Sequence, residues 1–297
     1  MRGSLRASII SDLANAELRE ISQQNPYPKW STLCWLRLHG FPTLEAAFVA
    51  PPAAAELPLM VAKLRQATGK QSLLVRSDGG REKRRYYRGG SSFSEDRALR
   101  EARELLDADR AVVLMEPTNR FTNQVSVALR IHRCGELVME LLGPGFDVSD
   151  LSRGGVPPAA SLTVSQVDWT SFREPGLSDF RLVRFESDEQ VWARRLERLK
   201  ILATQILPSS GEFKQAGEPR DAVAWLRRHG WTSILDQCRL TVSLRRLRSL
   251  YEDAFWIAHR FDRSNWACLA ATASLLDDGR FIWWDIVDAA RKFGDPR

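Results

Sequence analysis

Hydrophobic residues follow two different patterns along this chain, and the pattern changes near residue 188. Before that point, short runs of valine, leucine and alanine are bounded by glycine, proline, asparagine or serine, which is typical of β-strands. The predicted strands are residues 44–49, 72–76, 111–115, 124–131, 136–142 and 160–167. After that point, apolar residues recur every three or four positions, which predicts helices.

Two helices are predicted between these strands. Residues 30–39 repeat apolar side chains at helical spacing and end at Gly40, a residue suited to a helix C-terminus. Residues 94–107 open with Ser-Glu-Asp, a helix-start signal, and place their alanines and leucines on one face. The first part of the chain is therefore predicted to belong to the α+β class.

The later part of the chain is predicted to be all-helical. The expected helices are residues 190–206, 221–229, 233–250, 255–276 and 281–293, with a break at residues 207–211. Eight of the ten tryptophans lie from Trp169 onward, where they either fill a core or form a surface for a protein partner or a nucleic-acid base. We therefore predict two domains, one over residues 1–187 and a helical, tryptophan-rich one over residues 188–297.

The composition is that of a folded globular protein. With 297 residues, of which 44% are hydrophobic and 27% charged, the chain is not wholly disordered, collagen-like or a disulfide scaffold. No apolar run approaches the ~20 residues needed to cross a bilayer, and the first residues do not form a signal-peptide core. The four cysteines include no Cys-x-x-Cys pair. We therefore predict a cytoplasmic protein without a membrane partner, a zinc site or disulfides.

The charge balance favours an anionic partner. Lysine and arginine number 43 against 37 acidic residues, and the pI is near 9.4, which suits a nucleotide, a nucleic acid or an acidic protein. Arginines also gather in the later part, at positions 227, 228, 239, 245, 246 and 248. Such a cluster follows a phosphate backbone in some proteins and lies on the solvated face of a helix in others, and both alternatives stay open.

Several common catalytic motifs are absent from the sequence. The four histidines are far apart, and there is no Gly-x-Ser-x-Gly elbow, His-Glu-x-x-His motif, Walker loop or Rossmann glycine fingerprint. What remains is Arg76, which ends a predicted strand before Ser77-Asp78-Gly79-Gly80 and a basic stretch. An arginine beside a flexible glycine loop can grip phosphate oxygens while backbone N–H groups close over them. A solvated basic hairpin or a nucleic-acid patch is the alternative.

Four motifs follow one another over residues 20–165. They are Tyr27-Pro28-Lys29 at a helix start before the turn Gly40-Phe41-Pro42, Val75-Arg76-Ser77-Asp78 before Arg88-Gly89-Gly90, the strand and hinge 112–116, and the strand 136–142 with the Gly/Pro-rich loop 143–158. In this order they resemble the ATP-grasp nucleotide-binding domain of the phosphoenolpyruvate synthase and pyruvate phosphate dikinase family. The resemblance covers about the first half of the chain.

The resemblance implies an ATP- and Mg²⁺-dependent phosphotransferase or ligase that acts on an unidentified acceptor. It implies that Lys29 and Arg76 are catalytic cations on the phosphates, that Glu116, Arg88, Gly89 and Gly90 bind the nucleotide, and that Glu140 and Asp147 hold Mg²⁺. Cations spread the charge on a transferring phosphoryl group, and carboxylate oxygens hold the metal that bridges phosphates.

The sequence also departs from the family pattern. Tyr27-Pro28 replaces the two glycines before the lysine, Asp78 replaces the second serine after the arginine, and the turn that is acidic in the family is basic here. The phosphohistidine domain and the pyruvate-binding barrel are missing, so we expect no complete dikinase cycle on this chain. The alternative to an enzyme is a non-catalytic, ATP-grasp-like subunit that binds a protein or a nucleic acid through its basic loops and helical domain.

Overall fold

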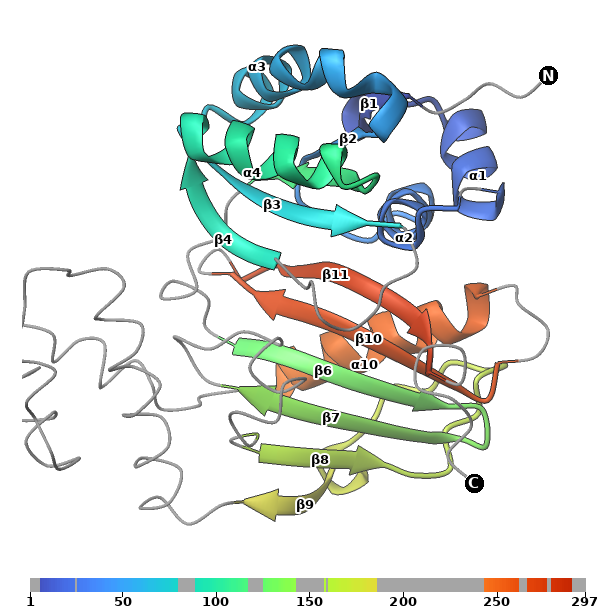
Figure 1. Cartoon of the computed structure of the whole chain (residues 1–297). Coiled ribbons are helices and arrows are strands. Elements are labelled where there is room, and N and C mark those ends of the chain that lie inside the picture. Colours follow the sequence, from blue (N-terminus) through green and yellow to red (C-terminus); the bar gives the residue numbers. More distant parts are fainter. Residues whose placement is uncertain are drawn as a thin grey trace, which may run out of the picture. The chain divides into compact units, whose positions relative to one another are not determined.

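The computed structural model of the chain describes residues 6–24, 26–79, 89–116, 125–142, 158, 160–185, 243–261, 266–276 and 279–289. The chain divides into two compact units (Figure 1). The first unit comprises Met1–Asn119 and Ile282–Asp285, and the second comprises Arg120–Phe281 and Ile286–Arg297. The predicted boundary between residues 187 and 188 lies outside the described residues.

A five-stranded antiparallel sheet forms the centre of the first unit. Its strands lie in the order β1-β2-β5-β3-β4. They are β1 (Ala7–Ile9), β2 (Ala46–Val49), β3 (Ser72–Asp78), β4 (Gly89–Ser94) and β5 (Ala111–Met115). The strands predicted near residues 44, 72 and 111 are confirmed as β2, β3 and β5, whereas the sequence patterns missed β1 and β4.

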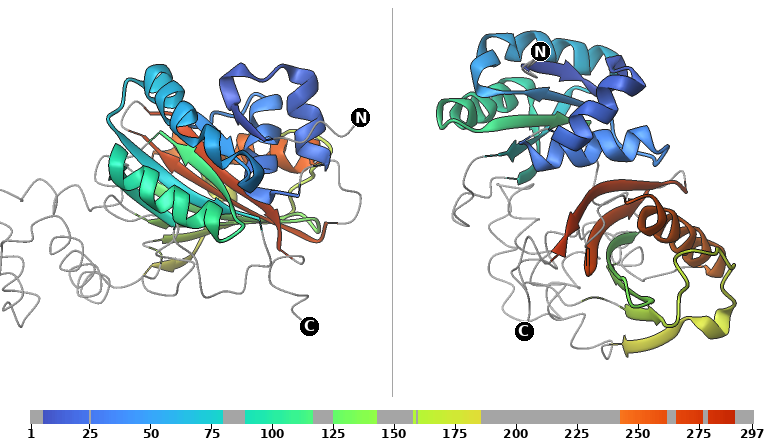
Figure 2. Two further views of the ribbon diagram at one scale, coloured as in Figure 1. Left: turned by 45° about the horizontal axis from the view of Figure 1, so that its top comes forward. Right: turned by 90° about the vertical axis from the view of Figure 1, so that its right-hand side faces the viewer.

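Two helices, α3 (Leu57–Thr68) and α4 (Glu95–Asp107), cover one face of this sheet (Figure 2). The helix α3 connects β2 to β3, which are the two neighbours of β5 in the sheet. The helix α4 connects β4 to β5, which are the two neighbours of β3. The two crossovers run in opposite directions across strands of opposite polarity. Crossovers of the usual right hand therefore place both helices on the same side. Leu64 of α3 and Ala102 of α4 accordingly share one buried cluster with Val75 of β3. The predicted helix 94–107 is confirmed.

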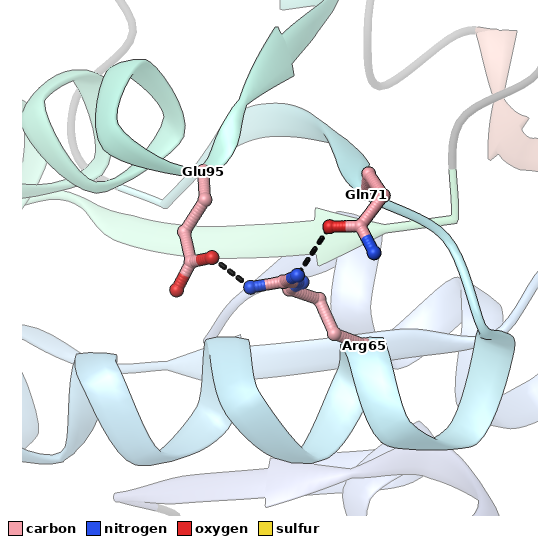
Figure 3. Close-up of polar contacts among 3 residues, drawn as sticks. All are labelled: Arg65, Gln71 and Glu95. Atoms are coloured by element: carbon pink, nitrogen blue, oxygen red, sulfur yellow. Dashed lines mark hydrogen bonds and ion pairs between the residues drawn. The ribbon is translucent and has the colours of Figure 1, made fainter.

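Polar contacts also join the end of α3 to the start of α4. The guanidinium group of Arg65 donates hydrogen bonds to the carboxylate of Glu95 and to the amide oxygen of Gln71 (Figure 3). Glu95 is the first residue of α4, where a negative charge is favoured by the helix dipole. Arg65 lies in the last turn of α3, where a positive charge is favoured for the same reason.

The helix α2 (Pro28–Leu38) packs on the opposite face of the sheet, and α1 (Asn15–Gln24) packs against α2. The indole of Trp30 stacks on the ring of Phe48 in β2, with 5.3 Å between the ring centroids. Alternation along a strand places every second side chain on this face. The predicted helix 30–39 is confirmed, and it starts two residues earlier, at Pro28.

Four residues of the last strand, Ile282–Asp285, belong to the first unit. The backbone N–H of Trp283 donates a hydrogen bond to the carbonyl of Pro42 at 2.9 Å. The indole of Trp283, which is fully buried, also meets the ring of Phe41 edge-on, with 6.3 Å between the centroids. The end of the chain thus supplies part of the packing of a unit formed mainly by its beginning.

The second unit contains five strands, β6 to β10, of a six-stranded sheet in the order β11-β10-β6-β7-β8-β9, and the helix α10 (Leu244–Arg260), which packs on β6 (Figure 1). The strands are β6 (Val125–His132), β7 (Glu136–Leu142), β8 (Ala160–Val164), β9 (Arg181–Phe185), β10 (Cys268–Leu275) and β11 (Phe281–Asp288). Short 3-10 turns also occur at Ile10–Asp12, Pro51–Glu56 and Leu177–Asp179. The strands predicted near residues 124, 136 and 160 are confirmed as β6, β7 and β8.

The prediction of an all-helical later part is wrong. The predicted helices 255–276 and 281–293 contain β10 and β11, and only α10 is helical among the described residues of this part. Leu269 and Ala271 of β10 are buried, whereas the intervening Ala270 is half-buried, which is the alternation of a strand. Pairing of β10 with β6 overrides the helical propensity of its alanines. The predicted helices 190–206 and 221–229 lie outside the described residues.

None of the described helices combines the length and the hydropathy that a membrane crossing requires.

Candidate functional site

The start of α2 and the end of β3 are joined through the side chain of Asp78. Its carboxylate accepts hydrogen bonds from the backbone N–H groups of Lys29 at 3.1 Å, of Trp30 at 2.7 Å and of Gly79 at 2.9 Å. The first N–H groups of a helix have no partner within the helix, so this carboxylate acts as the cap. Pro28, the first residue of α2, has no N–H group to satisfy. Asp78 therefore fixes α2 to β3 from within the fold.

Lys29 lies beside this cap and is itself buried, with 8% of its surface exposed. Its Nζ atom donates a hydrogen bond of 2.5 Å to the backbone carbonyl of Ser77, the residue before Asp78. A buried ammonium group is unfavourable unless it is hydrogen-bonded and close to a negative charge. Both conditions are met here, because the positive charge of Lys29 interacts with the carboxylate of Asp78.

The electrostatics of Asp78 reflect two opposing effects. Burial raises the pKa of its carboxyl group above the ordinary value of 3.8, because the charged form is removed from water. The N–H groups of Trp30 and Lys29, together with the charges of Lys29 and Arg76, act on this pKa in the opposite direction. Both predicted cations therefore lie within electrostatic reach of one carboxylate.

The turn after Asp78 closes against the residue that precedes α2. Gly79 has a φ of +72°, a left-handed conformation that favours glycine. A Cβ atom at this position would lie 2.5 Å from Cδ1 of Tyr27. The ring of Tyr27 also lies 5.0 Å from that of Phe48, centroid to centroid. The two departures from the family pattern, Tyr27-Pro28 and Asp78, therefore complement each other in space.

Arg76 lies on β3 two residues before Asp78 and is half-buried. Its Nη1 atom lies 3.5 Å from the carbonyl oxygen of Trp284 and 3.8 Å from the sulfur of Met115, both long for hydrogen bonds. Within the described part of the chain, no other nitrogen of this guanidinium group has a hydrogen-bond partner. The structure thus brings Lys29 and Arg76 to the same end of one strand.

The predicted glycine segment also comes to this strand end. Gly89 pairs with Arg76 in the β3–β4 ladder, and Gly90 follows it in β4, whereas Arg88 lies outside the described residues. Glu116 directly follows β5, and its N–H donates to the carbonyl of Glu45 at 2.9 Å. Met115 pairs with Leu74 near the start of β3, whereas Asp78 at its end pairs with Ala111. The half-buried Glu116 therefore lies at the opposite end of β3, and the structure does not bring it to the strand end where Lys29 and Asp78 meet.

Glu140 belongs to the second unit, so it is described apart from these residues. On β7 it pairs with Ala128 on one side and Ser161 on the other, and its Oε2 atom lies 3.5 Å from Nη2 of Arg130. These positions alternate with the buried apolar ones, so they form a more polar face of the sheet. Asp147 lies outside the described residues. In the ranges that the structure describes, no three histidine, cysteine or acidic residues gather as metal ligands.

Asp78 is the residue of this region whose role the sequence did not predict. Asp78 lies 49 residues after Lys29 in the sequence, where no local pattern connects it with the start of α2. One signal was available, because Tyr27 precedes the helix and lacks a side chain that caps helices. A helix that begins with proline and has no local cap can receive its cap from another segment, as α2 does from Asp78.

No model of a known protein family matches the chain, and no curated protein matches it either. Solved structures match it at low identity. D-cycloserine synthetase DcsG is 13% identical with a TM-score of 0.38, and the match covers 85% of this chain and 59% of that one. The D-alanine–D-alanine ligase from Coxiella burnetii is 11% identical with a TM-score of 0.38, and the match covers 89% of this chain and 48% of that one. The ATP-grasp ligase PsnB, complexed with a minimal precursor, is 13% identical with a TM-score of 0.33, and the match covers 93% of this chain and 56% of that one.

This chain spans about half the length of these solved structures, at 48% to 59% of each. Similarity at such TM-scores does not establish a shared activity. None of the three is a phosphoenolpyruvate synthase or a pyruvate phosphate dikinase, and a relation to that family stays a prediction.

Proposed function

We propose that this chain is an ATP-dependent ligase of the ATP-grasp type, with the end of β3 as its phosphate-binding part. The observation that carries the proposal is the position of Arg76 opposite Gly89 in the β3–β4 ladder. Two of the motifs that carry the resemblance, one with Lys29 and one with Arg76 and Gly89, meet at this strand end. The acceptor is unidentified, and phosphotransferase chemistry of the phosphoenolpyruvate synthase type is the finer alternative.

The physical reason lies in the charge of the ligand. A triphosphate needs cations that neutralise it and backbone N–H groups that approach it closely. The guanidinium group of Arg76 offers a planar fork for phosphate oxygens. Gly89 stands opposite Arg76 in the ladder, and the absence of a side chain there permits a close approach to the backbone.

Mg²⁺ belongs to the same proposal. It is commonly held by one or two carboxylates together with the phosphates of the substrate. The family resemblance alone leads us to propose Glu140 and Asp147 for this role. Bound Mg²⁺ would neutralise the charge that develops on the phosphates during transfer.

Isothermal titration of the full chain with ATP and Mg²⁺ tests the proposal. We expect saturable binding that is weakened in the Glu140→Gln variant when Mg²⁺ is present. Arg133→Gln serves as a control, because it changes another polar position near the end of β6. Absence of ATP binding by the wild-type chain would refute the proposal.

A non-catalytic interaction subunit is the second candidate. The observation that favours it is Asp78, whose charge offsets the cations at the strand end and whose carboxylate occupies the start of α2. On this hypothesis, a fixed partner should co-purify with the chain whether or not nucleotide is present. If added ATP dissociates that partner, or if no partner co-purifies, the ligase is favoured.

A further inference from the structure

We infer that Lys29 and Asp78 form an internal charge pair that closes the start of α2, and that Arg76 alone of the two predicted cations contacts the phosphates. This inference rests on the proposed nucleotide site and assigns its parts. Asp78 is then a positioning residue, because it holds α2 and Lys29 without touching the ligand.

The start of α2 has no N–H group left for a phosphate among its first three residues. Pro28 has none, and the N–H groups of Lys29 and Trp30 both donate to Asp78. The carboxylate that accepts them is fully buried. In many nucleotide-binding proteins a phosphate occupies this place at a helix N-terminus. Here the chain supplies its own anion, so the helix start acts as a structural joint.

Lys29 is committed to the same joint. Only 8% of the surface of Lys29 is exposed, and its Nζ atom donates a hydrogen bond to the carbonyl of Ser77. To contact a phosphate, this ammonium group would have to leave its buried position. Asp78 would then lose a compensating charge, and an uncompensated buried charge is strongly unfavourable.

Arg76 differs from Lys29 in each of these respects. It is half-buried, its hydrogen bonds are long, and its Nε and Nη2 atoms have no partner in the part of the chain that the structure describes. It also faces the Gly89 position of the neighbouring strand. Of the two cations, it therefore retains the donors with which a guanidinium group binds a phosphate.

The test compares four variants of the full chain: Arg76→Ala, Lys29→Met, the double variant Lys29→Met with Asp78→Asn, and the control Arg100→Ala on the exposed surface of α4. Thermal melting is measured without nucleotide, and affinity for ATP with Mg²⁺ is measured by titration well below each melting temperature. The double variant removes both charges of the pair but keeps only one of the two oxygen acceptors at position 78, because both carboxylate oxygens of Asp78 accept backbone N–H groups.

We expect Arg76→Ala to weaken ATP binding about tenfold or more, as the loss of a charge-assisted hydrogen bond does. Its melting temperature should fall less than that of Lys29→Met, because Arg76 is half-buried and Lys29 is buried. Lys29→Met should melt at a clearly lower temperature because it leaves Asp78 with one compensating charge fewer. The double variant should recover part of that melting temperature, because no unpaired charge is left while one N–H acceptor is lost, and it should bind ATP within about threefold of wild type. Arg100→Ala should resemble wild type in both measurements.

Three outcomes would overturn the inference. If the double variant melts like Lys29→Met alone, the two residues are not a pair. If it melts above Lys29→Met but binds ATP about tenfold more weakly than wild type, then Lys29 contacts the phosphates. If the wild-type chain binds ATP but Arg76→Ala binds it equally well, Arg76 is not the contact. A wild-type chain that binds no ATP refutes the proposed function and the role of Arg76, while the melting temperatures still decide whether the pair exists.

Discussion

The substitution Asp78→Ala should destabilise the first unit by about 3–5 kcal/mol. It removes the acceptor of three backbone N–H groups and leaves the buried ammonium group of Lys29 without its carboxylate. Loss of a helix cap costs about 1 kcal/mol, and a buried charge that loses its partner costs about 3–5 kcal/mol. The two costs overlap because they arise at one group, so we take the larger one as the expected magnitude.

Urea unfolding followed by far-UV circular dichroism measures this change, and hydrogen exchange shows where it arises. In Asp78→Ala, the backbone N–H groups of Lys29 and Trp30 lose their acceptor, so a peptide that covers the start of α2 should exchange faster than in wild type. Asp107→Ala, an exposed aspartate at the end of α4, is the matched control. A destabilisation within about 0.5 kcal/mol of that control would refute the reasoning, since changes of this size are typical of surface sites.

Three further predictions concern the same unit. Burial raises the pKa of Asp78 above 3.8, so its contribution to the free energy of unfolding, relative to Asp78→Asn, should be fully present below pH 3.8. This contribution should decline as the pH rises through the folded-state pKa, as measured by urea unfolding of both proteins across this range. Gly79→Ala should lower the melting temperature more than Gly40→Ala does: both have positive φ, but a Cβ at Gly79 would meet Tyr27 at 2.5 Å whereas nothing lies within 4 Å of one at Gly40. Burial raises the pKa of the Cys34 thiol to about 12, so iodoacetamide at pH 8 should label it only after unfolding, and labelling of Cys34 in the folded chain, detected by mass spectrometry, would contradict this.

Local sequence patterns identified five of the nine helices and strands described in the first unit and missed α1, α3, β1 and β4. The strands β2, β3 and β5 are apolar runs between residues that break regular structure, and α4 has one apolar face. These signals depend on neighbours in the sequence, so they can be recognised without a structure. The strand β4 was missed because its glycine and serine residues carry no hydrophobic alternation, and its place depends on pairing with β3.

The wrong prediction of a helix over residues 255–276 has another cause, because a local helical preference is present there and the sheet overrides it. Residues 268–275 contain three alanines and two leucines, which favour a helix by intrinsic propensity. Their conformation is decided by β6, which pairs with all eight residues of β10. Propensity differences are a few tenths of a kcal/mol per residue, and burial and pairing within a sheet outweigh them.

The candidate site was predicted in part. The family resemblance assigns Arg76 and Gly89 to one nucleotide site, and the structure places them opposite each other in the β3–β4 ladder. Lys29 was selected with them and comes to the same strand end, but its burial and its hydrogen bond to Ser77 were not predictable. A lysine at the start of a helix is usually exposed, and only the packing of α2 on the sheet buries this one.

From its order of amino acids alone, this chain determined its class, most strands of its first unit and the cations that gather at one strand end. Only the tertiary structure determined which of those cations is half-buried and which is buried. The fold brings Asp78 to the start of α2, where Lys29 is buried beside it. The physical reason is the range of the forces involved. Helix and strand preferences arise between neighbours in sequence, whereas desolvation and hydrogen-bond partners depend on which distant segments the fold brings together.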